Sequence, residues 1–120
     1  MSIRREQINP TFEVFVGTKK QFLLTVIDPD TNEKKDLVDA AIYATGVAKI
    51  FKSDGTAVGA DMAIVYEAPR SDGIISFIVL DTDHTLPANA GNWWGEVEFI
   101  NNVAEIIDQQ RFGINIIESY

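Results

Sequence analysis

Hydrophobic and polar residues alternate along most of the chain, and this two-residue period predicts β-strands rather than helices. In the segment 11–17, for example, Phe12, Val14 and Val16 share one face. Clusters of Gly, Pro, Asn and Asp separate the alternating segments and are typical of turns. We therefore expect about seven strands, at residues 11–17, 20–29, 40–55, 60–68, 74–80, 93–101 and 105–117.

The spacing of these strands, roughly 10 to 15 residues with no long helical period, predicts an all-β domain built as a sandwich or barrel. The chain has 120 residues, which fits one domain. Residues 1–9 precede the strand pattern. We expect them to form an N-terminal arm, with the domain at residues 10–120.

Residues 74–80 read IISFIVL and are almost wholly apolar, which predicts a central strand packed on both faces. The segment 81–91 that follows is where the chain is expected to cross from one sheet to the other. Asp81 or Thr82 could cap a short helical turn there, and Pro87 would end it.

The pair Asp54-Gly55 lies between two of the expected strands and predicts a β-hairpin. A type I′ turn requires positive φ angles at both central residues, and Asp-Gly is among the pairs that favour it. We therefore expect a tight hairpin at residues 52–56.

The two tryptophans of the chain, Trp93 and Trp94, are adjacent. Neighbouring residues of a strand point to opposite faces, so the two rings cannot lie on one flat platform. Trp93 shares its face with Val97 and is expected in the core, whereas Trp94 shares the polar face and is expected toward solvent or a partner. Gly95 leaves space for a large ring to fold over the backbone.

The composition narrows the possible partners. The formal net charge is −8 and the sequence pI is about 4.4, so we do not expect nucleic-acid binding. The chain has no cysteine, which excludes disulfides and thiolate metal sites. No apolar run is long enough to span a membrane, and the first ten residues lack the apolar core of a signal peptide.

His84 is the single histidine and lies beside Asp83, but nothing marks a serine as its nucleophile. We expect a polar turn residue there, and no enzymatic activity or cofactor. The face shared by Glu96 and Glu98 is expected to be a solvated strand face. Calcium is the metal that the acidic turns leave open, at Asp28, Asp30 and Asn32 or at Asp81 and Asp83, although neither matches a calcium loop.

An extended arm can add a strand to the sheet of a neighbour. The segment INPTFEVFVG (8–17) is a candidate for such pairing, because Pro10 opposes a helix and the following residues alternate. The expected interface residues are Ile3, Ile8, Phe12 and Trp94. Tryptophan is enriched among the residues that dominate protein interfaces.

Four segments, AKIFKSDGTAV, AIVYEAPRSDGIISFIV, WWGEVEF and FGINII, follow one another in an order that resembles a known family. Residues 20–117 are similar to the immunoglobulin-like N-terminal domain of phage baseplate upper proteins and related phage virion structural proteins. The resemblance implies an immunoglobulin-like antiparallel β-sandwich that docks on the head, neck, tail or baseplate. It implies other virion proteins as partners, a possible homo-oligomer, and a virion location after assembly in the host cytoplasm.

The alternative is a carbohydrate-binding β-sandwich module, perhaps one that also holds calcium. It would need a groove lined by Trp94 and a tyrosine such as Tyr43 or Tyr66. Sugar-binding surfaces place aromatic rings where a ligand can reach them, so the exposure of these rings distinguishes the two readings.

Overall fold

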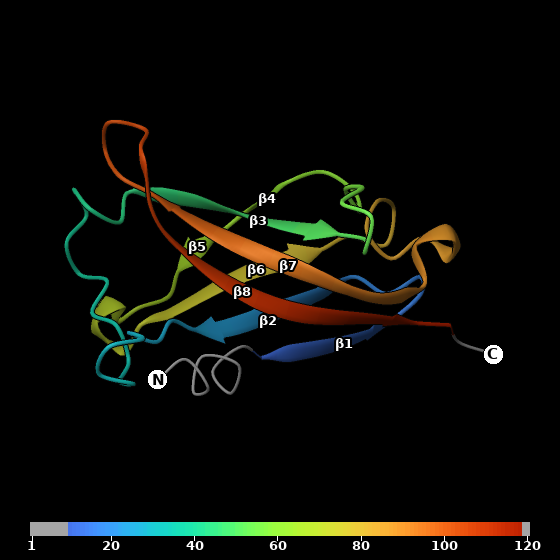
Figure 1. Cartoon of the computed structure of the whole chain (residues 1–120), viewed down its shortest axis with the longest axis horizontal. Helices are drawn as coiled ribbons and strands as arrows, with labels where there is room; N and C mark the ends of the chain where they lie inside the picture. The colour runs from blue at the N-terminus through green and yellow to red at the C-terminus, as the bar shows by residue number, and fades with distance from the viewer. Residues whose placement is uncertain (1–9, 119–120) are drawn as a thin grey trace.

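The computed structural model describes residues 10–118, and within them the chain forms two β-sheets stacked as a sandwich (Figure 1). The all-β sandwich that the alternation predicts is therefore confirmed. The expected arm at residues 1–9 lies outside the described residues. The strands are β1 (Thr11–Phe15), β2 (Lys20–Thr25), β3 (Thr45–Phe51), β4 (Met62–Ala63), β5 (Val65–Tyr66), β6 (Ile74–Val79), β7 (Gly91–Ile100) and β8 (Ile106–Ile117), with short 3₁₀ turns η1 (Arg70–Asp72) and η2 (Pro87–Asn89).

The larger sheet has the strand order β1-β8-β7-β3-β4 and the smaller one the order β2-β6-β5. The orders β8-β7-β3-β4 and β2-β6-β5 correspond to the G-F-C-C′ and B-E-D strands of an immunoglobulin variable-type sandwich. The connection between β6 and β7 crosses from the smaller sheet to the larger one, as expected. The topology is thus immunoglobulin-like.

One strand pair departs from the antiparallel pattern that the sequence predicted. β1 runs parallel to β8, with Thr11 opposite Gly113 and Phe15 opposite Ile117. Alternation fixes which side chains share a face, but it carries no information on which strand is the neighbour. The pairing begins where the Pro10 carbonyl accepts the Gly113 N–H at 2.8 Å.

The expected strand at 60–68 is in fact two short strands in different sheets. Ala63 of β4 pairs with Val47 in the larger sheet, whereas Val65 of β5 pairs with Ser76 in the smaller sheet. Between them Ile64 packs on Gly46, where a Cβ atom would lie 2.6 Å from the Ile64 Cδ1. Gly46, which lies within β3, therefore permits the close approach of the switching segment.

The core lies between the sheets and follows the predicted alternation. Val97 and Phe99 of β7 are fully buried, and the Phe112 ring of β8 covers Gly95. A Cβ atom at Gly95 would lie 2.1 Å from the Phe112 Cζ, so only glycine fits beneath the ring. This confirms the prediction that a large ring folds over the backbone there, and burying one such ring stabilises the fold by about 2–3 kcal/mol.

Two turns differ in detail from their predictions. In the hairpin after β3, only Gly55 has a positive φ, of 89°, and Asp54 instead accepts the Thr56 N–H with its carboxylate at 2.9 Å. The turn is therefore a type I turn completed by a left-handed glycine rather than a type I′ turn. In the second case Pro87 begins the 3₁₀ turn η2 instead of ending a helical turn, which its fixed φ favours.

Candidate interaction surfaces

Trp94 lies on the outer face of the larger sheet, opposite Trp93, as strand parity predicts. Its cross-strand partner Phe51 stacks on it with ring centroids 4.7 Å apart, and the Arg111 guanidinium lies 4.9 Å from the ring centroid. The other cross-strand neighbour is Gly113, which has no side chain beside the ring. Two side chains of the same chain therefore engage Trp94, and it is half-buried.

Trp93 points to the opposite side and packs against the core, although its side chain is only partly buried. The indole N–H donates a hydrogen bond to the Asn89 carbonyl at 2.8 Å, and the Lys52 ammonium lies 5.5 Å from the ring. The prediction that the Trp93 side chain points toward the core is thus correct. The ring closes the end of the sandwich beneath η2.

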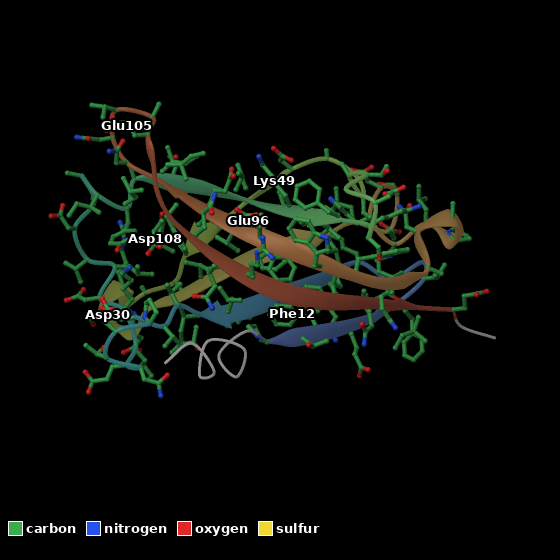
Figure 2. All side chains as sticks on the ribbon, viewed as in Figure 1. Phe12, Asp30, Lys49, Glu96, Glu105 and Asp108 are labelled. Atoms are coloured by element: carbon green, nitrogen blue, oxygen red, sulfur yellow. The ribbon has the colours of Figure 1, made fainter. Side chains whose placement is uncertain are left out.

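Phe12 was expected to contribute to an interface, but its ring turns toward the core. It stacks on Phe22 with centroids 4.6 Å apart and contacts the edges of Phe77 and Phe112 at 6.0 and 5.8 Å. Figure 2 shows it on β1, the edge strand of the larger sheet. Phe12 therefore closes the seam between the two sheets, whereas Ile3 and Ile8 lie outside the described residues.

Charged residues also lie on the outer face of the larger sheet, together with the outward Phe15 of β1, which is 53% exposed. Lys49 and Glu96 are cross-strand partners over β3 and β7, and Figure 2 shows both there. The Lys49 ammonium lies 3.1 Å from the Glu98 carboxylate, and this hydrogen bond raises the pKa of Lys49 against the opposing effect of burial. Glu96 and Glu98 thus form part of a solvated strand face, as expected.

His84 is buried in the turn after β6, with 1% of its surface exposed. Its Nδ1 accepts the Leu80 N–H at 2.9 Å, and its Nε2 lies 2.8 Å from the Ala60 carbonyl oxygen. This arrangement places the proton on Nε2, which then donates to Ala60. Both ring nitrogens are engaged, so His84 ties the segment before β4 to the end of β6.

Acidic side chains in the turns accept hydrogen bonds from backbone N–H groups. Asp28 accepts the Asp30 N–H with its carboxylate at 2.9 Å, and Asp83 accepts the Ala60 N–H at 2.8 Å. Across residues 10–118, no group of three or more His, Asp or Glu side chains is placed to hold a metal ion. Asp28 thus stabilises its own turn, whereas Asp83 joins the turn after β6 to the segment before β4.

The outer face of the smaller sheet is apolar. Leu23 of β2 and Val65 of β5 are 55% and 57% exposed, and the buried Ser76 of β6 lies between them in the register. Ile78 is the next outward residue of β6 after Ser76, and it is 42% exposed. The outward positions within these three strands are uncharged: Gln21, Leu23, Thr25, Val65, Ile74, Ser76 and Ile78. One charged group lies beside them, because the carboxylate of Glu67, the residue after β5, accepts the Ser76 hydroxyl at 2.5 Å.

Residues 74–80 were expected to be packed on both faces, and this is wrong within residues 10–118. Ile75, Phe77 and Val79 fill the core, but the outward Ile78 has no covering layer. The apolar sequence of this strand nevertheless indicates that its outer face is apolar as well as its inner face. Typical antiparallel strands place polar residues on the side that meets water.

A groove of about 280 Å³ opens beside β6 on this same face. The buried Met62 and Phe77 lie at its base, and the more exposed Val65, Ile78 and Leu80 line its walls. Asp61 and Asp83 supply its two carboxylates. We call this the β6 groove. Neither the groove nor its acidic rim was predicted from the sequence, because the sheet switch between β4 and β5 creates it.

A second exposed apolar region lies at the opposite end of the sandwich, around the β7–β8 hairpin. Val103 and Ile106 are 66% and 54% exposed, and Ile42 of the neighbouring turn is 45% exposed. A hydrogen bond of 3.0 Å from the Asn102 N–H to the Ala41 carbonyl joins the hairpin to that turn. This region consists of loop tips, whereas the β6 groove is built on strands.

Comparison with protein-family models and with curated proteins finds no match for the chain. Within residues 10–118, no helix is long and apolar enough to cross a membrane. The role of the surfaces is therefore argued from their own chemistry.

Proposed function

We propose that the chain is a non-enzymatic structural module that docks on larger partners through the outer face of β2, β6 and β5. The observation that carries this proposal is the exposed aliphatic face around Leu23, Val65 and Ile78. Exposed apolar patches that are built on regular strands are typical of protein–protein contact sites. The β6 groove extends the same face and offers a shaped recess for a partner side chain.

The assembly that we propose is a bacteriophage virion, in which the module is an accessory component of the head, neck, tail or baseplate. The support is the resemblance of its strand and turn pattern to phage virion structural proteins, together with its immunoglobulin-like topology. A fold alone does not define a function. The partners would be other virion proteins, and the site of action would be the particle.

Carbohydrate binding has less support. The rings that were expected to line a sugar groove are engaged within the chain: Trp94 stacks on Phe51, Tyr43 is 8% exposed, and the Tyr66 hydroxyl donates to the Thr45 carbonyl at 2.6 Å. The β6 groove is lined mainly by aliphatic side chains. Sugar recognition usually relies on exposed aromatic faces and several polar groups.

The test is incorporation into particles. Phage whose genome encodes the chain are grown with a tagged copy supplied in trans, and particles purified by density gradient are analysed for the tag. The unchanged copy is expected in the particles, and the Ile78→Asp variant is expected to be lost from them. The Glu96→Gln variant changes the other outer face and is the matched control, which should incorporate normally.

Two results would contradict the proposal. If the unchanged chain is missing from purified particles, the virion assignment fails. If Ile78→Asp incorporates as well as Glu96→Gln does, the outer face of the smaller sheet is not the docking surface. A circular dichroism melt of each variant shows whether the fold is retained, because an exposed strand position should tolerate either change.

A further inference from the structure

We propose that the β6 groove binds residues 1–9 of a second copy of this chain, as a strand added to the edge of β6. This inference rests on the proposed docking role of the same face and names its partner. The contact would be heterologous, since the arm of one copy would occupy the groove of the next. Contacts of this kind generate rings or filaments.

The first argument is an open strand edge. The β5–β6 pairing ends at Val65 and Ser76, because Ala63 pairs with Val47 in the other sheet. No strand within residues 10–118 pairs with Ile78 on that edge. Alternate residues of a strand direct their main-chain groups to the same edge. Since the Ile74 carbonyl faces β5, where it accepts the Glu67 N–H, the N–H and carbonyl of Ile78 also face this edge.

The groove lies against this open edge and has the composition that strand addition uses. An added strand gains main-chain hydrogen bonds from the edge, while its alternate side chains enter pockets. The groove has a volume of about 280 Å³, which is enough to admit aliphatic side chains. Ile3 and Ile8 are the branched aliphatic residues of the segment 1–9.

Charge favours the same occupant. Residues 1–9 have a net charge of +1, because Arg4 and Arg5 outnumber Glu6. The whole chain has a net charge of −8, so residues 10–120 carry −9. The charged residues that line the groove are Asp61 and Asp83, and the side chain of Asp83 is 39% exposed. Attraction between the two arginines and these two carboxylates would favour binding and fix the direction in which the segment lies in the groove.

The position of Pro10 favours a second copy over the same chain. β1 and β6 run in the same direction, because β2 is antiparallel to β6 and runs opposite to β1 in Figure 1. The ends of β1 and β6 lie close together, since the Gly17 N–H donates to the Thr85 carbonyl at 2.8 Å. Pro10, which follows residues 1–9 in the sequence, therefore lies at the start of β1, away from the end of β6 where the groove lies. Nine residues span at most about 30 Å when extended, and a reversal toward their own groove would consume part of that reach.

The test uses the absence of cysteine in the natural chain. Single-cysteine variants are made at Ile3→Cys or Ile8→Cys in one preparation and at Ala63→Cys in another. The two preparations are mixed and oxidised, and linked chains are resolved by mass. We expect a mixed dimer with at least one arm variant. Glu96→Cys replaces Ala63→Cys as the control on the other outer face, and we expect at least tenfold less product there.

Light scattering provides the second measurement. The full-length chain is expected to associate with rising concentration, and removal of residues 1–9 is expected to leave a monomer. Asp61→Arg should weaken association at least tenfold, and Arg4→Asp with Arg5→Asp in the same chain should restore part of it. This charge exchange separates a direct contact from a general loss of stability.

A monomer at all concentrations with no mixed dimer would overturn the inference. An internal link in a chain that carries both Ile3→Cys and Ala63→Cys, without mixed dimers, would also overturn it by placing the arm in its own groove. Either outcome leaves the proposed function standing if Ile78→Asp still prevents incorporation into particles. The failure of the inference is thus distinct from the failure of the docking proposal.

Discussion

Both sheets of the sandwich turn one face toward solvent, but different residues fill these two faces. On the larger sheet, Lys49 pairs with Glu98, and Trp94 is held between Phe51 and Arg111. On the smaller sheet, the exposed Leu23, Val65 and Ile78 are uncharged. The first face pairs charged groups and packs Trp94 within the chain, and its main exposed apolar side chain is Phe15 at the edge strand β1. The second face leaves a group of aliphatic side chains without a partner in residues 10–118.

The difference shows that the size of an exposed residue is a poor guide to an interface. The large aromatic Trp94 attracts attention in the sequence, yet its neighbours of the same sheet already use much of its surface. Smaller aliphatic residues remain uncovered on the other sheet. A side chain is available to a partner according to what its cross-strand neighbours leave exposed.

The largest expected effect is a difference in stability between substitutions on the two outer faces. Trp94→Ala removes a half-buried stack and its cation–π contact, so we expect the free energy of unfolding to fall by about 1–2 kcal/mol. Leu23→Ala on the other face should cost less than about 0.5 kcal/mol, since little of its contact area is buried. Urea unfolding of both variants measures the difference. A larger loss for Leu23→Ala would reverse the comparison.

A smaller effect is expected at Arg111. Arg111→Gln keeps much of the side-chain length but removes the charge over the Trp94 ring, so we expect a loss of about 0.5–1 kcal/mol. The matched control is the same substitution in a Trp94→Ala background, where Arg111→Gln should have almost no effect. An equal loss in both backgrounds would show that Arg111 acts through something other than the ring.

The pair of Lys49 and Glu98 should contribute still less. Its atoms are partly exposed, and such pairs usually contribute about 0.2–1 kcal/mol. We expect a double-mutant cycle with Lys49→Ala and Glu98→Ala to give a coupling of about 0.5 kcal/mol that shrinks at 1 M salt. A coupling that is unchanged by salt would indicate that the pair is shielded from solvent, which would contradict its partial exposure on the outer face of the larger sheet.

The smallest effect at neutral pH concerns Tyr66, whose hydroxyl joins β5 to the Thr45 carbonyl of the larger sheet. Burial raises the pKa of Tyr66 to about 12, while the nearby Arg70 acts in the opposite direction. The unfolded chain loses this proton near pH 10. Tyr66 should therefore leave stability unchanged below about pH 10 and lower it as the pH rises toward about 12.

Unfolding by urea at several pH values between about 8 and 12, with Tyr66→Phe as the control, isolates this contribution. The control lacks the ionisable hydroxyl, so its stability should fall less over the alkaline range. Absorbance of the phenolate follows the titration directly. Ionisation of Tyr66 near pH 10 in the folded chain would show that the hydroxyl is open to solvent, and the join between the sheets would then be weaker than the structure indicates.

Much of the fold could be predicted from local sequence. The parity of Trp93, Val97 and Phe99 identifies the inward face of β7, and Gly95 marks the space that the Phe112 ring fills. These predictions succeed because alternation and residue size act over neighbouring positions. The arrangement of strands as an all-β sandwich follows from the same signals.

The features that escaped prediction depend on contacts between distant segments. The alternation of residues 60–68 predicts one strand, and nothing local indicates that Ala63 and Val65 pair in different sheets. The stacking of Trp94 on Phe51 likewise requires the register between β3 and β7. The β6 groove exists only where the sheet switch leaves one edge of β6 open at Ile78, so local sequence could indicate its apolar strand but not its shape.

The parallel pairing of β1 with β8 has a mechanical consequence. The start of β1 at Thr11 and the end of β8 at Ile117 lie at opposite ends of the paired stretch. Tension applied between these two exits slides the strands lengthwise, so the hydrogen bonds along all five paired positions bear the load together. A hairpin pulled apart from its open end instead breaks its bonds one after another. A neighbour pulling on residues 1–9 would therefore meet the pairing in shear, its most resistant direction.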